Sequence, residues 1–222
     1  MKTALVFGSS GLIGSHLLNQ LIKNNNYSKI KLFVRSVPEI NNAKIEIIKT
    51  DFNNLGNHRD DIKGDDCFFC IGTTKQNAPN KNEYRRIELD VPKEIAQIAK
   101  SNSVNSFVFV SSGFADPKNS GDYLRFKGEV EEELKKLNFP KLGILRPSFL
   151  MGDRKENRVG EKIGIFIFKL LSPLFLGPLK KMKPIHSETV ANAMIMVAQF
   201  DLNQTIFESN QIVEINEFKY YG

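Results

Sequence analysis

Short runs of apolar residues alternate along the chain with longer stretches in which apolar residues recur at helical spacing. The short runs contain few polar residues, which is typical of parallel strands buried on both faces. The longer stretches are typical of helices that cover such a sheet. The pattern predicts strands at residues 4–7, 30–34, 45–48, 67–71, 107–110 and 142–145. It predicts helices at residues 12–23, 83–100 and 123–137, and a later helix that contains Val190, Ala193, Met194 and Val197.

This alternation predicts an α/β fold, a doubly wound parallel sheet with the strand order 3-2-1-4-5-6. The chain has 222 residues, which is enough for one sizeable core, so we expect a single domain that spans residues 1–222. Within residues 83–100, Pro92 predicts a kink or a break into two helices. Ser187 is the expected N-cap of the last helix.

Charge and composition narrow the classes of function. The chain has 31 Lys and Arg against 25 Asp and Glu, which gives a net charge of +6 that is spread without a basic block. This balance favours anionic small-molecule partners and predicts no nucleic-acid partner. The amino terminus reaches glycine and serine too early for a signal peptide, which predicts a cytoplasmic protein.

The residues that commonly bind metals are badly spaced for that role. Cys67 and Cys70 are the two cysteines of the chain, and on a strand residues three apart point to opposite faces. His16, His58 and His186 lack metal-ligand spacing, and no G-x-S-x-G sequence supports a hydrolase triad. We therefore predict no metal site and no redox pair of cysteines.

A glycine-rich turn joins the first predicted strand to the first predicted helix. Gly8, Gly11 and Gly14 form a G-x-x-G-x-x-G pattern, which departs from the G-x-G-x-x-G of the standard dinucleotide fingerprint. Glycine lets the backbone approach a pyrophosphate, and a helix N-terminus supplies unpaired N–H donors. The turn predicts a phosphate-binding site, and the alternative is a tight turn that binds nothing.

Arg35 directly follows the second predicted strand, where a site specific for NAD places an Asp or Glu. Its guanidinium matches a 2′-phosphate in charge and geometry, so it predicts a preference for NADP(H). The alternative is an arginine that only faces solvent.

Tyr123 and Lys127 place a phenol and an ammonium one turn apart on a charged helix. A neighbouring cation lowers the pKa of a tyrosine, which suits the phenol for general acid or base catalysis. Tyr27 has a lysine at the same spacing but leads into a predicted strand. Ser111 and Ser112 end the fifth predicted strand at the edge where ligands bind, so either hydroxyl is a candidate to bind a substrate carbonyl.

Together these features resemble the atypical short-chain dehydrogenase/reductases, which have an NAD(P)-binding Rossmann fold, and above all their HTATIP2-like branch. The likeness also covers residues 70–74, 127–131, 146–148 and 153–158. It implies that residues 147–186 form a small segment on the substrate side of the domain. It implies cofactor contacts from Gly8, Ser10, Gly11, Leu12, Ile13, Gly14, Arg35, Asp51, Ile71, Gly72, Thr73, Tyr123, Lys127, Pro147, Leu150 and Arg158.

The predicted function is NADP(H)-dependent hydride transfer to or from a small carbonyl or alcohol, with NAD(H) as a second acceptable cofactor. Ser111 or Ser112 would orient the carbonyl, Tyr123 would deliver the proton, and Lys127 would tune Tyr123 and hold the ribose. Ser36 stands where a second arginine often follows the first in the family, which softens the NADP preference. The alternative is a regulatory or interaction protein that senses the dinucleotide without turnover.

Residues 163–179 form the most apolar stretch of the chain. Lys169, Pro173 and Pro178 interrupt it, and a membrane span needs about 20 apolar residues, so we predict no span. We interpret the stretch as a lid over the nicotinamide end, which implies an apolar substrate. The alternatives are core packing or an exposed patch that serves a dimer or a membrane surface. We expect a monomer or a homodimer.

Overall fold

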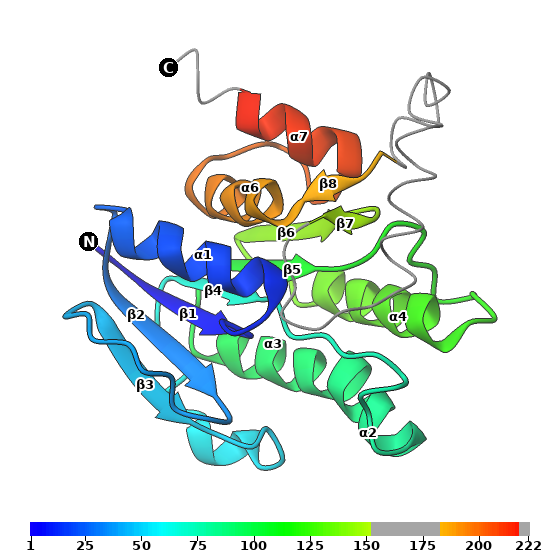
Figure 1. The fold of residues 1–222 in the computed structure, drawn as a ribbon, viewed down its shortest axis with the longest axis horizontal. Helices are drawn as coiled ribbons and strands as arrows, with labels where there is room; N and C mark the ends of the chain where they lie inside the picture. Colours follow the sequence, from blue (N-terminus) through cyan, green and yellow to red (C-terminus); the bar gives the residue numbers. More distant parts are fainter. Residues whose placement is uncertain (152–182, 218–222) are drawn as a thin grey trace.

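A seven-stranded sheet lies at the centre of the computed structural model, which describes residues 1–151 and 183–217 (Figure 1). Every neighbouring pair of strands is parallel, and the order β3-β2-β1-β4-β5-β6-β9 confirms the predicted fold class and extends the predicted order by one strand. The strands are β1 (Lys2–Phe7), β2 (Tyr27–Val34), β3 (Ile45–Lys49), β4 (Asp66–Phe69), β5 (Ser106–Val110), β6 (Lys141–Arg146) and β9 (Ile206–Glu208). A second, two-stranded sheet pairs β7 (Leu150–Met151) with β8 (Ile185–His186).

Helices cover both faces of the large sheet (Figure 1). One face carries α1 (Leu12–Lys23) and α6 (Ser187–Gln199), with α7 (Ser209–Glu217) packed against α6. The other face carries α3 (Val91–Ser101) and α4 (Asp122–Lys136). Short helical segments are the 3-10 turn η1 (Leu55–His58), α2 (Lys81–Arg85) and the π-helical turn η2 (Arg86–Asp90).

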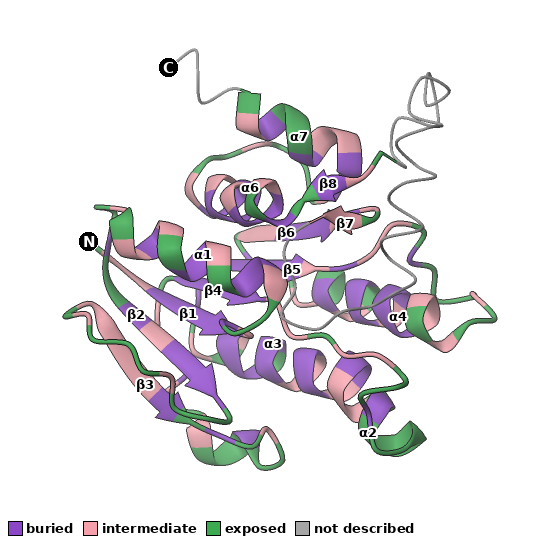
Figure 2. Cartoon of the chain, in the orientation of Figure 1, coloured by how far each residue is buried: buried purple, intermediate pink, exposed green. Residues whose placement is uncertain are grey.

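The core consists of one apolar cluster on each face of the sheet. In β1, Ala4 and Val6 point to the cluster under α1 and α6, whereas Leu5 and Phe7 point to the cluster under α3 and α4. Figure 2 shows buried residues on the strands and on the helix sides that face them. Because both faces are covered, the strands are apolar at successive positions, which is why the sequence pattern located them.

The segment from residue 81 to 101 divides as Pro92 predicts, but it does so through a π-helical turn. Pro92 lies in the first turn of α3, where its missing N–H costs no hydrogen bond. The wider π turn shifts the buried face, so Ile87 is half-buried while Glu88 is fully buried. Ile87, an apolar residue of the predicted helix at 83–100, is therefore not one of the fully buried residues of this segment.

The structure also bears on the predictions for the two cysteines, for Ser187 and for residues 163–179. Cys67 and Cys70 contact different apolar clusters, which confirms that they point to opposite faces. The N-cap prediction for Ser187 is wrong, because His186 occupies the cap position and Ser187 is a buried first-turn residue. The predicted lid at residues 163–179 lies outside the described residues.

Within the described part of the chain, none of the helices combines the length and apolar character that a membrane crossing requires. The same residues contain no group of three or more His, Cys, Asp or Glu side chains arranged to hold a metal ion.

Candidate functional site

The glycine turn lies where β1 leads into α1, at the carboxyl edge of the sheet. Gly8 has a φ of +92°, and a Cβ at that position would lie 2.8 Å from the carbonyl carbon of Cys70 after β4. A Cβ at Gly14 would lie 2.0 Å from the carbonyl oxygen of Gly8. Only glycine therefore lets the turn adopt this backbone and lets α1 pack directly on it.

The beginning of α1 provides donors for an anion. Gly11 is the N-cap and has no side chain to cap the helix, and the side-chain bond in this turn, from Ser15 Oγ, goes to the carbonyl oxygen of Leu12 and not to an N–H group. Ser10 and Gly11 are exposed, Leu12 is half-buried and Ile13 is buried. The order of strands reverses between β1 and β4, so this helix end faces the crevice where dinucleotides bind in doubly wound sheets. The N–H of Gly11 donates to the carbonyl oxygen of Gly8 at 3.1 Å, which closes the turn, and the N–H groups of the first turn of α1 fit a pyrophosphate.

Arg35 and Asp51 follow β2 and β3, which pair in parallel up to Val34 and Lys49. Both side chains are exposed at the same edge of the sheet. The Asp51 carboxylate accepts hydrogen bonds from the backbone N–H and the side-chain amide of Asn53, which lower the pKa of Asp51. Starting from the glycine turn after β1, Arg35 follows the neighbouring strand β2 and Asp51 follows the next strand, β3. This is the side of the sheet on which the adenosine half of a dinucleotide would extend.

The loop after β4 is tied to the π-helical turn. Ile71 is half-buried, Gly72 is exposed, and the backbone N–H of Thr73 donates to Oε1 of Glu88 at 2.5 Å. A Cβ at Gly72 would lie 3.5 Å from the same oxygen. The N–H of Thr73 is therefore committed to Glu88, which leaves the exposed Gly72 as the part of the loop open to a ligand.

The two serines after β5 differ in their surroundings. Ser111 is buried and donates from Oγ to Oε1 of Glu131 at 2.5 Å. Ser112 is half-buried, and its hydroxyl makes one long bond, 3.3 Å, to the carbonyl oxygen of Gly113. Because Glu131 already holds Ser111, the geometry favours Ser112 for a substrate, a choice that the sequence left open.

Tyr123 and Lys127 lie on α4 against the end of β5. Tyr123 is partly exposed, whereas Lys127 is buried, with 3% of its surface accessible. The Lys127 ammonium lies 5.8 Å from the centroid of the Tyr123 ring, 4.9 Å from that of Phe109, and 3.5 Å from the carbonyl oxygen of Val110. The structure thus brings the predicted Tyr-Lys pair to the strand end that carries the two serines.

Glu88 is the partner of Lys127, with 3.0 Å between Oε2 and Nζ. Burial alone lowers the pKa of Lys127, but the charge of Glu88, assisted by Tyr123, outweighs it and raises the pKa above its usual value. Sequence reasoning missed Glu88. The available signal was an acidic residue four positions from Tyr84 in a stretch that is otherwise apolar on its buried side.

The remaining predicted contacts lie after β6. Pro147 is buried, and its carbonyl oxygen accepts the N–H of Gly113 at 2.9 Å, which joins the loops after β5 and β6. Leu150 is half-buried in β7. Arg158 lies outside the described residues.

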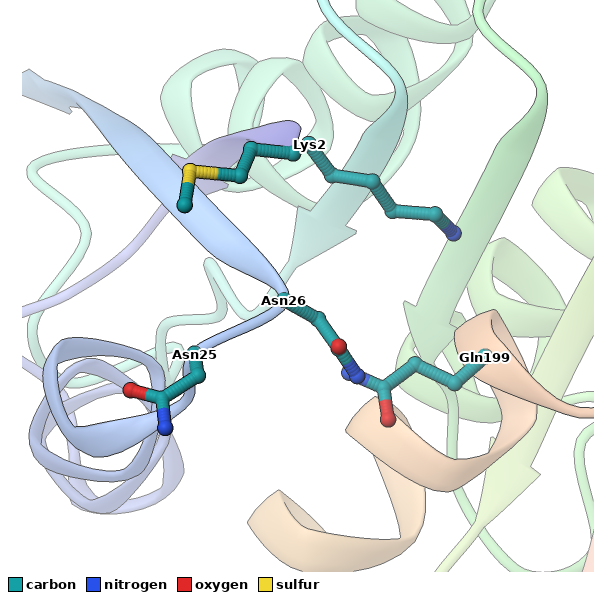
Figure 3. A pocket seen from close by; sticks show the side chains of 5 residues that line it. Lys2, Asn25, Asn26 and Gln199 are labelled. Atoms are coloured by element: carbon teal, nitrogen blue, oxygen red, sulfur yellow. The ribbon is translucent and has the colours of Figure 1, made fainter.

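A hollow lies at the other edge of the sheet (Figure 3). It measures about 300 Å³ and is lined by Met1, Lys2, Asn25, Asn26 and Gln199. Met1, Asn25 and Asn26 precede β1 and β2, Lys2 begins β1, and Gln199 ends α6, so the hollow lies at the amino-terminal ends of the strands. It is separate from the crevice at the glycine turn, because parallel strands place that crevice at their carboxyl ends.

Comparison with known proteins gives consistent results. A family model described as NAD(P)H-binding matches residues 8–166. Protein HTATIP2 of Rattus norvegicus is 34% identical over 166 residues, which cover 72% of this chain and 67% of that protein. Protein FMP52-1, mitochondrial, of Scheffersomyces stipitis is 31% identical over 204 residues, which cover 89% of this chain and 88% of that protein.

Solved structures agree on the fold. UDP-glucose 4-epimerase from Thermotoga maritima, with UDP-glucose, has a TM-score of 0.69 at 16% identity and covers 99% of this chain and 83% of its own. The Bordetella bronchiseptica enzyme WbmH, in complex with NAD+, has a TM-score of 0.66 at 16% identity and covers 89% of this chain and 72% of its own. At these identities the similarity shows a Rossmann-like fold and nothing finer.

The parallel sheet, the glycine turn at its switch point and the matched sequence define a Rossmann protein that binds a nicotinamide dinucleotide: the chain belongs to the NAD(P)H-binding family. Within it, the identity to HTATIP2 confirms the resemblance to the HTATIP2-like branch of the atypical short-chain dehydrogenase/reductases.

The prediction of a cytoplasmic location is wrong. Relatives from Scheffersomyces stipitis, Candida glabrata, Meyerozyma guilliermondii and Emericella nidulans are named mitochondrial. The prediction rested on the lack of a secretory pattern, which does not separate the cytoplasm from organelles that are reached by other signals.

Proposed function

We propose that this chain is an NADP(H)-dependent oxidoreductase that transfers a hydride between the nicotinamide and a small carbonyl or alcohol. The observation that carries the proposal is the position of the buried Lys127 ammonium, between the ring of Tyr123 and the carbonyl oxygen of Val110. A proton donor, a cation that acts on it and the strand end that carries Ser112 are thereby close together.

Each of these residues has a role in the reduction of a carbonyl. The dinucleotide, when bound, supplies the hydride. The phenol of Tyr123 gives its proton to the carbonyl oxygen, and the positive charge of Lys127 favours the phenolate that results. The hydroxyl of Ser112 donates a hydrogen bond to the same oxygen and orients it. Oxidation of an alcohol uses the same groups in reverse.

Cofactor binding rests on the other half of the crevice. The N–H groups at the start of α1 would hold the pyrophosphate, and Arg35 would contact the 2′-phosphate of NADP(H). Several solved structures with this fold are named as complexes with NAD, so the choice between the two cofactors is part of the test.

The experiment is NADPH oxidation by the purified protein against a panel of aldehydes, ketones and quinones. Tyr123→Phe removes only the phenolic oxygen. On a substrate that the native protein reduces, we expect it to abolish turnover while NADP+ affinity stays within a few-fold, because the turn contacts remain.

Tyr27→Phe is the matched control. Tyr27 has the same spacing to a lysine but donates to the buried Asp66 at 2.7 Å, at the amino-terminal edge of the sheet. This variant should lose stability and keep its turnover. Full activity of Tyr123→Phe would refute the assignment of the proton donor. Tight NADP(H) binding without turnover of any panel member would favour a protein that senses the cofactor.

A further inference from the structure

Glu88 is a fully buried carboxylate at the predicted cofactor edge, with none of its surface accessible. Burying an ionised carboxylate costs several kcal/mol unless a partner of opposite charge and hydrogen-bond donors compensate. An apolar residue would fill the same place on the π-helical turn without that cost. A carboxylate kept there needs a reason beyond packing.

The two oxygens of Glu88 contact different parts of the site. Oε2 lies 3.0 Å from the ammonium of Lys127 on α4. Oε1 accepts the backbone N–H of Thr73, in the loop after β4. One side chain therefore connects the helix that carries the Tyr-Lys pair to the loop that begins with Ile71 and Gly72.

We propose that Glu88 is a positioning residue, which fixes the Lys127 ammonium relative to the loop at 71–73 and keeps it charged when a dinucleotide binds. The proposal rests on the proposed function, because it assigns Lys127 to the cofactor ribose. It also goes further, because the ability of Lys127 to bind the ribose and to act on Tyr123 would depend on Glu88, which touches neither cofactor nor substrate.

Charge explains why the carboxylate is required. Lys127 is buried, and burial disfavours the protonated amine. Tyr123 and Glu131 of α4 also raise the pKa of Lys127, and the Cys70 thiol after β4 lies within the reach of its charge, but Glu131 is already paired with Arg146 and Glu88 has the largest effect. Without the negative charge of Glu88, the pKa of Lys127 therefore falls, and above that pKa the amine is neutral. A neutral amine holds the ribose hydroxyls less tightly and exerts no field on the phenol of Tyr123.

Glu88→Gln separates charge from shape. The glutamine carbonyl still accepts the N–H of Thr73, so the variant removes the charge and keeps the loop contact. Glu94→Gln is the matched control, because Glu94 lies further along α3, is partly exposed and pairs with Arg86 at 2.9 Å. The double variant Glu88→Gln, Lys127→Met replaces the ion pair by neutral groups of similar size.

Two measurements test the proposal on the full chain. The first is NADP+ affinity by calorimetry between about pH 7 and pH 9.5, a range in which an ordinary lysine stays charged. The second is titration of the Lys127 side chain by NMR, without cofactor. We expect the native protein and Glu94→Gln to bind with an affinity that hardly changes with pH.

For Glu88→Gln we expect the dissociation constant to rise by up to about tenfold for each pH unit above the lowered pKa of Lys127. The double variant should bind weakly and show no such rise. A flat profile for Glu88→Gln, or an equal rise in the double variant, would overturn the positioning role. If the native protein binds no NADP+ but Glu88→Gln still lowers the pKa of Lys127, the ion pair acts as described and the proposed function is what fails.

Discussion

Arg146→Met should destabilise the protein strongly, because it leaves a buried carboxylate without its cation. Arg146 ends β6 and makes two bonds to Glu131 of α4, at 3.0 Å from Nε and at 2.5 Å from Nη2. Glu131 is 1% exposed, and its other contact is the hydroxyl of Ser111. The pair thus anchors the end of β5 as well as β6.

The magnitude follows from burial. Removing one partner of a buried ion pair costs about 3–5 kcal/mol, because the remaining charge stays desolvated. The matched control is Lys29→Met, which removes an ion pair of similar length, 2.7 Å to Glu46, between two exposed side chains. That change should cost less than about 1 kcal/mol. The double variant Arg146→Met, Glu131→Gln should regain part of the loss, because it removes the buried charge of Glu131 and leaves only Glu208, which pairs with Arg146 at 3.1 Å and is 30% exposed, without its cation.

The assay is urea unfolding followed by circular dichroism at several pH values. In Arg146→Met, protonation of Glu131 removes a buried charge that has no cation, so it stabilises the folded state more than the unfolded chain. Its free energy of unfolding therefore falls as pH rises, by at most about 1.4 kcal/mol per pH unit, and its deficit shrinks at acid pH. A loss below about 1 kcal/mol at neutral pH, or a deficit that ignores pH, would refute the reasoning.

Four further variants test the site. Arg35→Ala should weaken NADPH binding by about 1.5–3 kcal/mol and barely change NADH binding, and equal losses in calorimetry would contradict the 2′-phosphate contact. Ser112→Ala should lower turnover with little change in Tm. Ser111→Ala should lower Tm by about 2–4 °C, because it loses its bond to Glu131. If Ser111→Ala lost turnover and Ser112→Ala lost stability, Ser111 would be the serine that binds the substrate. Gly14→Ala should cost about 1–3 kcal/mol in stability and weaken NADP+ binding, because its Cβ meets the carbonyl oxygen of Gly8; an unchanged affinity would place the pyrophosphate elsewhere.

The positions of the first six strands were predictable because their residues are mostly apolar, and their order followed from the alternation of strands and helices, which is typical of a doubly wound sheet. β9 was not, since it has three residues, Ile206–Glu208, and depends on pairing with Ile144–Arg146 of β6. A strand this short forms because it pairs with a strand that is distant along the chain, and its own sequence has no pattern that predicts it.

The residue types at the site were predictable, but the partners that separate their roles were not. Ser111 and Ser112 are adjacent on a strand end, so the sequence shows that they face opposite ways but not which one meets a carboxylate. Glu131 decides this from α4, and it lies in a run of charged residues that reads as a solvated helix face. The role of Lys127 was predicted from its spacing to Tyr123, but its burial and its ion pair with Glu88 were not, because both depend on a segment that is distant along the chain.

The π-helical turn at Arg86–Asp90 determines whether Glu88 faces Lys127. A π turn holds one residue more than the α-helical turn that would take its place, so deleting one residue there would leave an α-helical turn. Deleting one residue there would rotate the preceding helix by about 100° relative to α3 and move Glu88 away from Lys127. Relatives that keep Lys127 but lack one residue in this turn would then have an unpartnered lysine, and percentage identity would not reveal it. A one-residue gap at this turn in a sequence alignment would therefore distinguish sites in which Lys127 has its acidic partner from sites in which it does not.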